Sequence, residues 1–288
     1  MTSTWRTVDE LDTSLLAQRD TLLFEVAQEA GEEALTEDQR ERIREGGPIR
    51  HVVRLDDAGR MTGYAVIATG TVLEAEPVLG TCDDALVNLL EGLGEPVRIL
   101  LRQVEDDCQA QMESRGWHPA RVLHHLVRDL PADPVRVVGV TMRTFVVGRD
   151  EPAWIAENNA AFAGHPSQGT MTVERLRRRE HEPWFDPEGF LLFEDAGEIV
   201  ASCWTKMRDT PVGPVGEIYV VSVSPSAQGR GLGRMATLAG LWSLYERGAK
   251  RGELFVESSN AAGRSLYAAL GFTPEERVVI FEFPTLSA

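Results

Sequence analysis

The chain has 288 residues, of which 45 are acidic and 29 are basic, so its formal net charge is -16. A surface with this excess of negative charge repels nucleic acid and anionic membranes, and we expect neither as a partner. The length suits one large domain or two of ordinary size. The three cysteines, Cys82, Cys108 and Cys203, are widely spaced and form no Cys-x-x-Cys motif, so we expect neither a disulfide framework nor a zinc site.

The sequence contains no pattern typical of a signal peptide or a membrane span. Residues 1–20 are polar and acidic, whereas a signal peptide is first basic and then apolar. No apolar run approaches the length that crosses a bilayer. We therefore expect a cytoplasmic protein.

Periodic patterns of apolar residues divide the first half into short helices and strands. Two strands, 50–55 and 61–68, flank residues 56–60 (Asp-Asp-Ala-Gly-Arg), a typical hairpin turn. The other elements that we expect are helices over 11–30, 37–45, 84–93 and 106–114, and strands over 72–75, 97–101 and 123–130.

Residues 131–134 (Pro-Ala-Asp-Pro) are predicted to be a linker, because two prolines bound them and no apolar pattern crosses them. A similar order of elements then begins again, and both halves close a helix with glycine and an aromatic residue. The second half is expected to contain helices over 151–162, 173–182, 232–245 and 261–270, and strands over 141–147, 190–194, 199–207, 216–223, 254–256 and 278–283. We predict an α/β chain with mixed sheets, made of two tandem domains of one fold over residues 1–131 and 135–288.

The strongest chemical signal is the run Gln228-Gly229-Arg230-Gly231-Leu232-Gly233-Arg234, between a predicted buried strand and a helix. A glycine-rich turn at a helix N-terminus offers unpaired backbone N–H groups and the positive end of the helix dipole to an anion. No Lys-Ser or Lys-Thr follows the last glycine, so a nucleotide-triphosphate loop of the Walker kind is excluded. The structural alternative is an ordinary strand-to-helix turn.

Together with Asn260-Ala261-Ala262, Tyr267 and Leu270-Gly271-Phe272, this loop resembles the GCN5-related N-acetyltransferase (GNAT) superfamily. The closer resemblance is to the mycothiol synthases, tandem pairs of GNAT domains that acetylate the cysteinyl amine of Cys-GlcN-inositol. The shared segments cover nearly the whole second half: 158–166, 184–189, 204–206, 216–221 and 256–258. The resemblance implies an N-acetyltransferase that uses acetyl-CoA as co-substrate, needs no metal, and is a monomer or a weak homodimer.

The resemblance also implies where acetyl-CoA binds. Its pyrophosphate is expected on backbone N–H groups of the glycine loop, and its pantetheine arm is expected to pair with the preceding strand. The expected cofactor-binding residues are Val221, Ser222, Val223, Gln228, Gly229, Arg230, Gly231, Leu232, Gly233, Arg234, Asn260, Arg264 and Ser265.

Three further residues match family positions that carry chemistry. Glu217, at the start of the cofactor strand, matches the general base, and Tyr267 matches the general acid. Lys206 matches a residue that contacts the acceptor, and it is one of only two lysines in the chain. The structural alternatives are a strand-end glutamate in water, a core tyrosine and a solvated lysine.

Two acceptor positions depart from the mycothiol synthase pattern. The family's His-Pro-Glu-Gln has Ser167 in place of glutamate, and the family's tyrosine before Val-Glu-Ser is Phe255. Each change removes a polar contact to a hydroxyl-rich acceptor. A different small amine, such as an amino acid-like, hydrazine or antibiotic-pathway metabolite, is therefore an alternative acceptor. An acyl-CoA sensor or scaffold without catalysis is the alternative of another class.

The first half departs further from the family. Its counterpart of the cofactor loop, residues 74–84, contains one glycine, no basic residue and four acids. Met112 corresponds to Tyr267 and cannot donate a proton. We therefore predict that residues 1–131 form a degenerate domain without the usual acetyl-CoA site.

Overall fold

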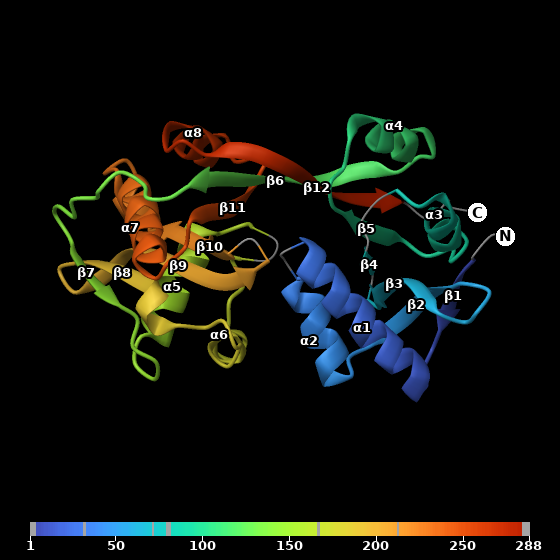
Figure 1. Ribbon diagram of the computed structural model, residues 1–288. Coiled ribbons are helices and arrows are strands. Elements are labelled where there is room, and N and C mark those ends of the chain that lie inside the picture. The colour runs from blue at the N-terminus through green and yellow to red at the C-terminus, as the bar shows by residue number, and fades with distance from the viewer. Residues whose placement is uncertain are drawn as a thin grey trace. The chain divides into compact units, whose positions relative to one another are not determined.

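The computed structural model describes residues 4–30, 33–70, 72–78, 82–165, 168–211 and 213–283 (Figure 1). The chain divides into two compact units. Unit 1 contains Met1–His125, Val256–Ala261 and Pro274–Ala288, and unit 2 contains Leu126–Phe255 and Ala262–Thr273. Both units are mixed α/β structures, as the sequence predicts.

Unit 1 is built on a sheet with the strand order β1-β2-β3-β4-β5-β12-β6. Its strands are β1 (Trp5–Val8), β2 (Ile49–Leu55), β3 (Met61–Ala68), β4 (Leu73–Pro77), β5 (Val97–Leu101), β12 (Thr273–Phe283) and the first part of β6 (His118–Asp129). Its helices are α1 (Thr13–Ala30), α2 (Glu37–Glu45), α3 (Asp84–Glu91) and α4 (Asp106–Ser114). The sequence analysis did not predict β1.

Both faces of this sheet are covered. Val52 and Val53, neighbours on β2, are fully buried in different hydrophobic clusters because successive strand residues project to opposite faces. The Val52 cluster includes Leu86 of α3, and the Val53 cluster includes Leu22 of α1.

The C-terminal strand β12 belongs to unit 1. It pairs antiparallel with β5, from Val279 opposite Leu101 to Phe283 opposite Val97. From chain order, this strand was expected at the end of the second half. Chain order misled here, because cross-strand pairing and burial decide where a strand docks.

Unit 2 has the strand order β6-β11-β10-β9-β8-β7. Its own strands are β7 (Thr141–Thr144), β8 (Phe190–Asp195), β9 (Glu198–Thr210), β10 (Gly213–Val223) and β11 (Arg251–Glu257), beside the last part of β6. Its helices are α5 (Glu151–Ala161), α6 (Val173–Glu180), α7 (Leu232–Glu246) and most of α8 (Ala261–Ala269), with short 3-10 turns at Pro187–Gly189 and Pro225–Ala227.

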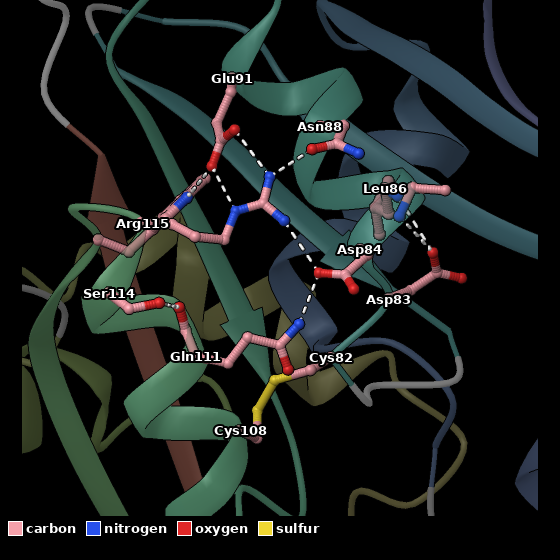
Figure 2. Close-up of polar contacts among 12 residues, drawn as sticks. Cys82, Asp83, Asp84, Leu86, Asn88, Glu91, Cys108, Gln111, Ser114 and Arg115 are labelled. Atoms are coloured by element: carbon pink, nitrogen blue, oxygen red, sulfur yellow. Dashed lines mark hydrogen bonds and ion pairs between the residues drawn. A yellow bond between two sulfur atoms is a disulfide. The ribbon is translucent and has the colours of Figure 1, made fainter.

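A disulfide joins Cys82 to Cys108, with the two Cα atoms 5.8 Å apart (Figure 2). Cys82 lies just before α3 and Cys108 lies in the first turn of α4, so the bridge ties together the starts of two helices. This single bridge corrects the expectation drawn from cysteine spacing. Pairing depends on proximity in space, which the spacing of three cysteines along a chain does not reveal.

Arg115 holds the same two helices together at the other end of α4. Its Nε donates to Glu91 at 3.0 Å and its Nη1 to Asp84 at 2.9 Å (Figure 2). The indole N–H of the buried Trp117 donates to the same Glu91 carboxylate at 2.9 Å. Arg115 and Trp117, which flank the glycine that follows α4, therefore attach α4 to α3.

A chain of hydrogen bonds, which we call the Glu157 chain, is buried between α5 and strands β9 and β10. Trp154 Nε1 donates to Ser202 Oγ at 2.9 Å, the hydroxyls of Ser202 and Ser222 lie 2.7 Å apart, and Ser222 donates to Glu157 Oε2 at 2.6 Å. Since Ser222 has one proton to give, Ser202 must donate to Ser222, and every donor points toward Glu157. Burial raises the pKa of Glu157 to about 7, although the Ser222 hydrogen bond lowers it in part.

Removing the Cys82–Cys108 bridge should destabilise the protein. In the chain-entropy description, a bridge across a sequence separation of 26 residues contributes about 3.5 kcal/mol to the free energy of unfolding. Urea unfolding of the wild type with and without dithiothreitol measures this loss. The C82S/C108S variant is the control and should not respond to dithiothreitol. An equal midpoint for oxidised and reduced wild type would contradict the expectation.

The buried Glu157 should make stability fall as pH rises. Its pKa is raised from the ordinary 4.5 to about 7 in the folded protein, so the native state keeps a proton that the unfolded chain has lost. The free energy of unfolding therefore falls between about pH 4.5 and pH 7, by at most about 3 kcal/mol. Urea unfolding across this range should show a shallower fall for E157Q than for the wild type. The exposed-site control E25Q should behave as the wild type, and equal slopes for E157Q and wild type would refute this effect.

Candidate active site

The parallel ladder between β10 and β11 is only three residue pairs long. It runs from Val215 opposite Arg251, through Gly216 opposite Gly252, to Glu217 opposite Glu253. Both strands continue past this point, β10 to Val223, while β10 stays paired with β9. Beyond Glu217, the backbone groups on the other edge of β10 are no longer bonded to β11, so this edge can pair with an extended ligand.

Two opposed glycines let α7 press closely on this ladder. A Cβ added to Gly216 would lie 2.5 Å from a methyl carbon of Leu244, and one added to Gly252 would lie 2.8 Å from a methyl carbon of Leu241. Both leucines are fully buried on α7. The close approach fixes α7 against the sheet just before the ladder ends.

The glycine loop connects the end of β10 to the start of α7. Gly229 and Gly231 have φ values of 78° and 77°, the left-handed region that favours glycine, and Gly231 is the N-cap residue of α7. No atom lies within 4 Å of a Cβ built on either glycine, so space is open beside both. An anion placed there would meet the first N–H groups of the helix and the positive end of its dipole. This arrangement fits a pyrophosphate.

The side chains around the loop contribute less positive charge than the sequence suggests. Arg230 and Arg234 are exposed, and Arg230 pairs with Asp195 at 2.8 Å. Leu232 is buried and fixes the first turn of α7. Backbone groups, rather than a cluster of arginines, are therefore the main feature of the loop that suits an anion.

Of the three β10 residues expected to line the cofactor, Val221 and Val223 are half-buried and Ser222 is buried. The hydroxyl of Ser222 donates to Glu157, on the side of the strand that packs on α5. A cofactor contact by Ser222 is therefore restricted to its backbone.

Glu217 lies directly opposite Lys206 in the antiparallel ladder of β10 and β9. Lys206 is only 9% exposed, and its ammonium lies 4.9 Å from the ring centre of Trp184, a cation–π contact. The Trp184 ring is also 5.0 Å from that of Tyr219. The structure thus brings together the expected base and the expected acceptor-binding lysine, beside two aromatic rings.

Tyr267 lies on α8 and is half-buried, with its ring 5.8 Å from that of Phe272. Burial raises the pKa of its phenol to about 12, with a smaller contribution from Cys203. Tyr267 therefore carries its proton throughout the neutral range, as a proton donor must. Burial likewise raises the pKa of the Cys203 thiol to about 12, which makes it a poor nucleophile.

The remaining expected site residues lie in or beside other elements. Phe255 is half-buried on β11, Asn260 is exposed just before α8, and Arg264 and Ser265 are exposed on α8. Ser167 lies outside the described residues.

Sequence reasoning overlooked three residues of this region. Trp184 was quoted only as part of a shared segment, yet it holds the Lys206 ammonium. Glu253 lies beside Glu217 because of strand register, which the sequence does not disclose. Glu157 gave a usable signal, since it lies three residues after Trp154 and so on the same helix face as this large apolar residue, which makes it a candidate for burial.

Unit 1 has a parallel ladder of the same length, between β4 and β5, from Leu73 opposite Val97 to Ala75 opposite Ile99. Its strand β4 ends two residues later at Pro77, which has no N–H to offer. Glu76 is 2% exposed, and its carboxylate accepts from the backbone and hydroxyl of Thr36 at 2.7 and 2.6 Å. Three residues of the corresponding loop, Leu79, Gly80 and Thr81, lie outside the described residues.

No three or more His, Cys, Asp or Glu side chains among the described residues are grouped so that they could hold a metal ion. None of the helices described combines the length and hydropathy of a membrane-spanning segment.

Comparison with solved structures supports the fold. A GCN5-related N-acetyltransferase from Sphaerobacter thermophilus has a TM-score of 0.70 and 23% identity, covering 99% of this chain and 98% of its own. A tandem GNAT protein from the clavulanic acid biosynthesis pathway has a TM-score of 0.65 and 17% identity, covering 99% of each chain. The predicted tandem fold is confirmed.

Comparison of sequences supports the family. Residues 152–272 match the acetyltransferase (GNAT) family. The mycothiol acetyltransferase of Streptomyces griseus is 36% identical, over 94% of this chain and 92% of its own. The mycothiol acetyltransferase of Geodermatophilus obscurus is 38% identical, over 93% of this chain and 94% of its own. The chain therefore belongs to the GNAT family of acetyltransferases.

Proposed function

We propose that the protein transfers the acetyl group of acetyl-CoA to the primary amine of a small metabolite in the cytoplasm, and that this acceptor is Cys-GlcN-inositol. The observation that carries the proposal is the meeting of Glu217 and Lys206 where the β10–β11 ladder ends. GNAT acetyltransferases use acetyl-CoA as co-substrate. The full-length similarity to proteins named mycothiol acetyltransferase supports the choice of acceptor.

The glycine loop and the edge of β10 would bind the co-substrate. Backbone N–H groups from Gln228 to Arg234 would hold its pyrophosphate, because they lie at the positive end of α7. The edge of β10 from Val221 to Val223 would pair with the pantetheine arm as an added strand. One N–H group on that edge would polarise the thioester carbonyl.

Glu217 would accept a proton from the amine, and Tyr267 would donate one to the leaving sulfur. Glu217 binds the incoming ammonium and accepts one proton from it. The amine nitrogen then bonds to the carbonyl carbon, and the carbon–sulfur bond breaks. Tyr267 donates its proton to the departing sulfur, and the second proton lost by nitrogen restores the phenol. The raised pKa of Tyr267 supports this assignment.

The side chains beside Glu217 suit a polar acceptor. Lys206 places a buried ammonium next to the base, where it can donate to hydroxyl or carbonyl oxygens of the acceptor. Trp184 offers a flat apolar surface at the same point. Ser167 stays a predicted contact of the acceptor.

A second candidate is the same reaction on a different small amine. Phe255 favours it, because it lies two residues beyond Glu253 on β11 and lacks the hydroxyl of the mycothiol synthase pattern. The two candidates are separated by incubating the protein with acetyl-CoA and Cys-GlcN-inositol, followed by mass spectrometry. Formation of the acetylated product supports the first candidate, and its absence with acetylation of another amine supports the second.

Acetyl-CoA should bind at one site per chain. We do not expect a second site in unit 1, because β4 ends at Pro77 and the sequence of its loop is acidic. Calorimetric titration should therefore give a stoichiometry of one. Two equal sites would overturn this part of the proposal.

Substituting Gly231 by alanine should weaken acetyl-CoA binding by about tenfold, because an alanine at φ 77° costs roughly 1–2 kcal/mol and disturbs the turn that holds the phosphates. G248A is the matched control, since Gly248 has φ 101° just beyond the other end of α7. Calorimetry should show wild-type affinity for G248A. Equal weakening in both variants would mean that the loop has no special role.

Removing either proton-transfer group should slow catalysis without changing cofactor affinity. We expect E217Q and Y267F each to lower kcat by about 100- to 10,000-fold, the usual contribution of a general base or acid. Steady-state kinetics measures the loss, and calorimetry with acetyl-CoA shows whether binding persists. Y245F, a tyrosine substitution on α7, should keep wild-type kcat. Unchanged kcat in E217Q would contradict the role of Glu217 as the base, whereas binding of acetyl-CoA without acetylation of any amine by the wild type would favour a non-catalytic acyl-CoA sensor.

A further inference from the structure

Glu217 stands in a row of charged residues that crosses three strands. Lys206 of β9 is its register partner on one side, and Glu253 of β11 is its register partner on the other. Register partners on neighbouring strands are about 5 Å apart and project to the same face. The side chains of Lys206, Glu217 and Glu253 therefore leave the sheet on one face, with Glu217 in the middle.

Glu253 is paired with an arginine that comes from beyond β10. The exposed fraction of Glu253 is 3%, and its Oε1 accepts from Nε of Arg208 at 3.1 Å and from Nη2 of the same side chain. Arg208 lies on β9, opposite Val215. Because β10 separates β9 from β11, this ion pair must cross the face of β10 beside Glu217.

The ion pair places one positive charge, on Arg208, and one negative charge, on Glu253, near Glu217. A carboxylate at this spacing raises the pKa of a neighbouring carboxyl, and a guanidinium lowers it. As long as both partners are present, their effects on Glu217 oppose each other. Removing one partner would expose Glu217 to the uncompensated charge of the other.

Two further cations, Lys206 and Arg251, lie on the strands beside β10. Lys206 of β9 is opposite Glu217, and Arg251 of β11 is two pairs away, opposite Val215. Helix α5 brings Glu157 to the far end of the strand, at Ser222. Helix α7 covers the other face, where Leu244 fills the space beside Gly216.

We propose that Arg208 and Glu253 form a positioning pair that sets the charge state of Glu217 and so the pH range in which it accepts a proton. The proposal rests on the proposed function, in which Glu217 is the general base. Neither residue is assigned contact with substrate. They act through Glu217, as an ion pair of zero net charge in which Glu253 is buried and Arg208 is half-buried.

The test measures the pKa of Glu217 directly, by carbon-13 NMR of protein labelled at the glutamate carboxyl carbons. The Glu217 signal is assigned by its loss in E217Q. We expect E253Q to lower this pKa by about 1 unit, because Arg208 is left uncompensated, and R208M to raise it by about 1 unit. The double variant R208M/E253Q, which restores zero net charge, should return the pKa to near the wild-type value. R208K keeps the charge and should shift it little.

The acidic limb of the kcat–pH profile should move in the same directions, to lower pH in E253Q and to higher pH in R208M. E282Q is the control, because it breaks the Arg98–Glu282 pair between β5 and β12 in unit 1 and should leave the profile unchanged. If the pair had only a structural role, kcat would fall in all variants, and the acidic limb of the kcat–pH profile would not move in opposite directions in E253Q and R208M.

Opposite shifts in the two single variants, cancelled in the double variant, would establish the pair. No shift, or shifts of the same sign, would overturn it. If R208M alone does not fold, the shift in E253Q and its reversal in R208M/E253Q decide the question. The NMR titration needs no turnover, so failure to acetylate any amine would overturn the proposed function while the pair is still tested.

Discussion

The three-pair ladder between β10 and β11 is the constraint on which the candidate site depends. If the ladder continued, the edge of β10 would be occupied by β11 and could not pair with an extended ligand. Its early end frees that edge. The last pair, Glu217 opposite Glu253, places a carboxylate at the point where the edge becomes available. In the proposed function, co-substrate binding and proton transfer would therefore both depend on this feature.

Helix α7 owes its position to the two opposed glycines of this ladder. Any side chain at Gly216 or Gly252 would collide with a leucine of α7, so the helix packs against the backbone itself. The same helix begins in the glycine loop, at Gly231. Close packing in the middle of the helix therefore determines where its N-terminal N–H groups lie relative to β10.

Much of this could be predicted from the sequence, where the signal was local. The apolar strand before Pro225, the glycine loop and the start of α7 at Leu232 follow from residue types at fixed spacing, and the fold and family follow from the motifs around them. Three features could not be predicted. The docking of β12 on β5, the Cys82–Cys108 bridge and the crossing of Arg208 to Glu253 depend on segments distant in sequence, and local propensity carries no information on such pairing. The short strand β1 was not predicted, because four residues are too few to show a periodic pattern of apolar residues.

The place of β12 has a consequence for how the protein is made. The sheet of unit 1 needs residues 279–283 beside β5, yet these residues are synthesised long after β5. Until then, a nascent chain that already contains residues 1–125 has β4 on one side of β5 but not β12 on the other, and the edge of β5 that β12 covers stays available for wrong partners. Unit 1 can therefore complete its sheet only after synthesis has passed residue 283, and a deletion of residues 279–283 would remove a strand from the sheet that contains residues 97–101.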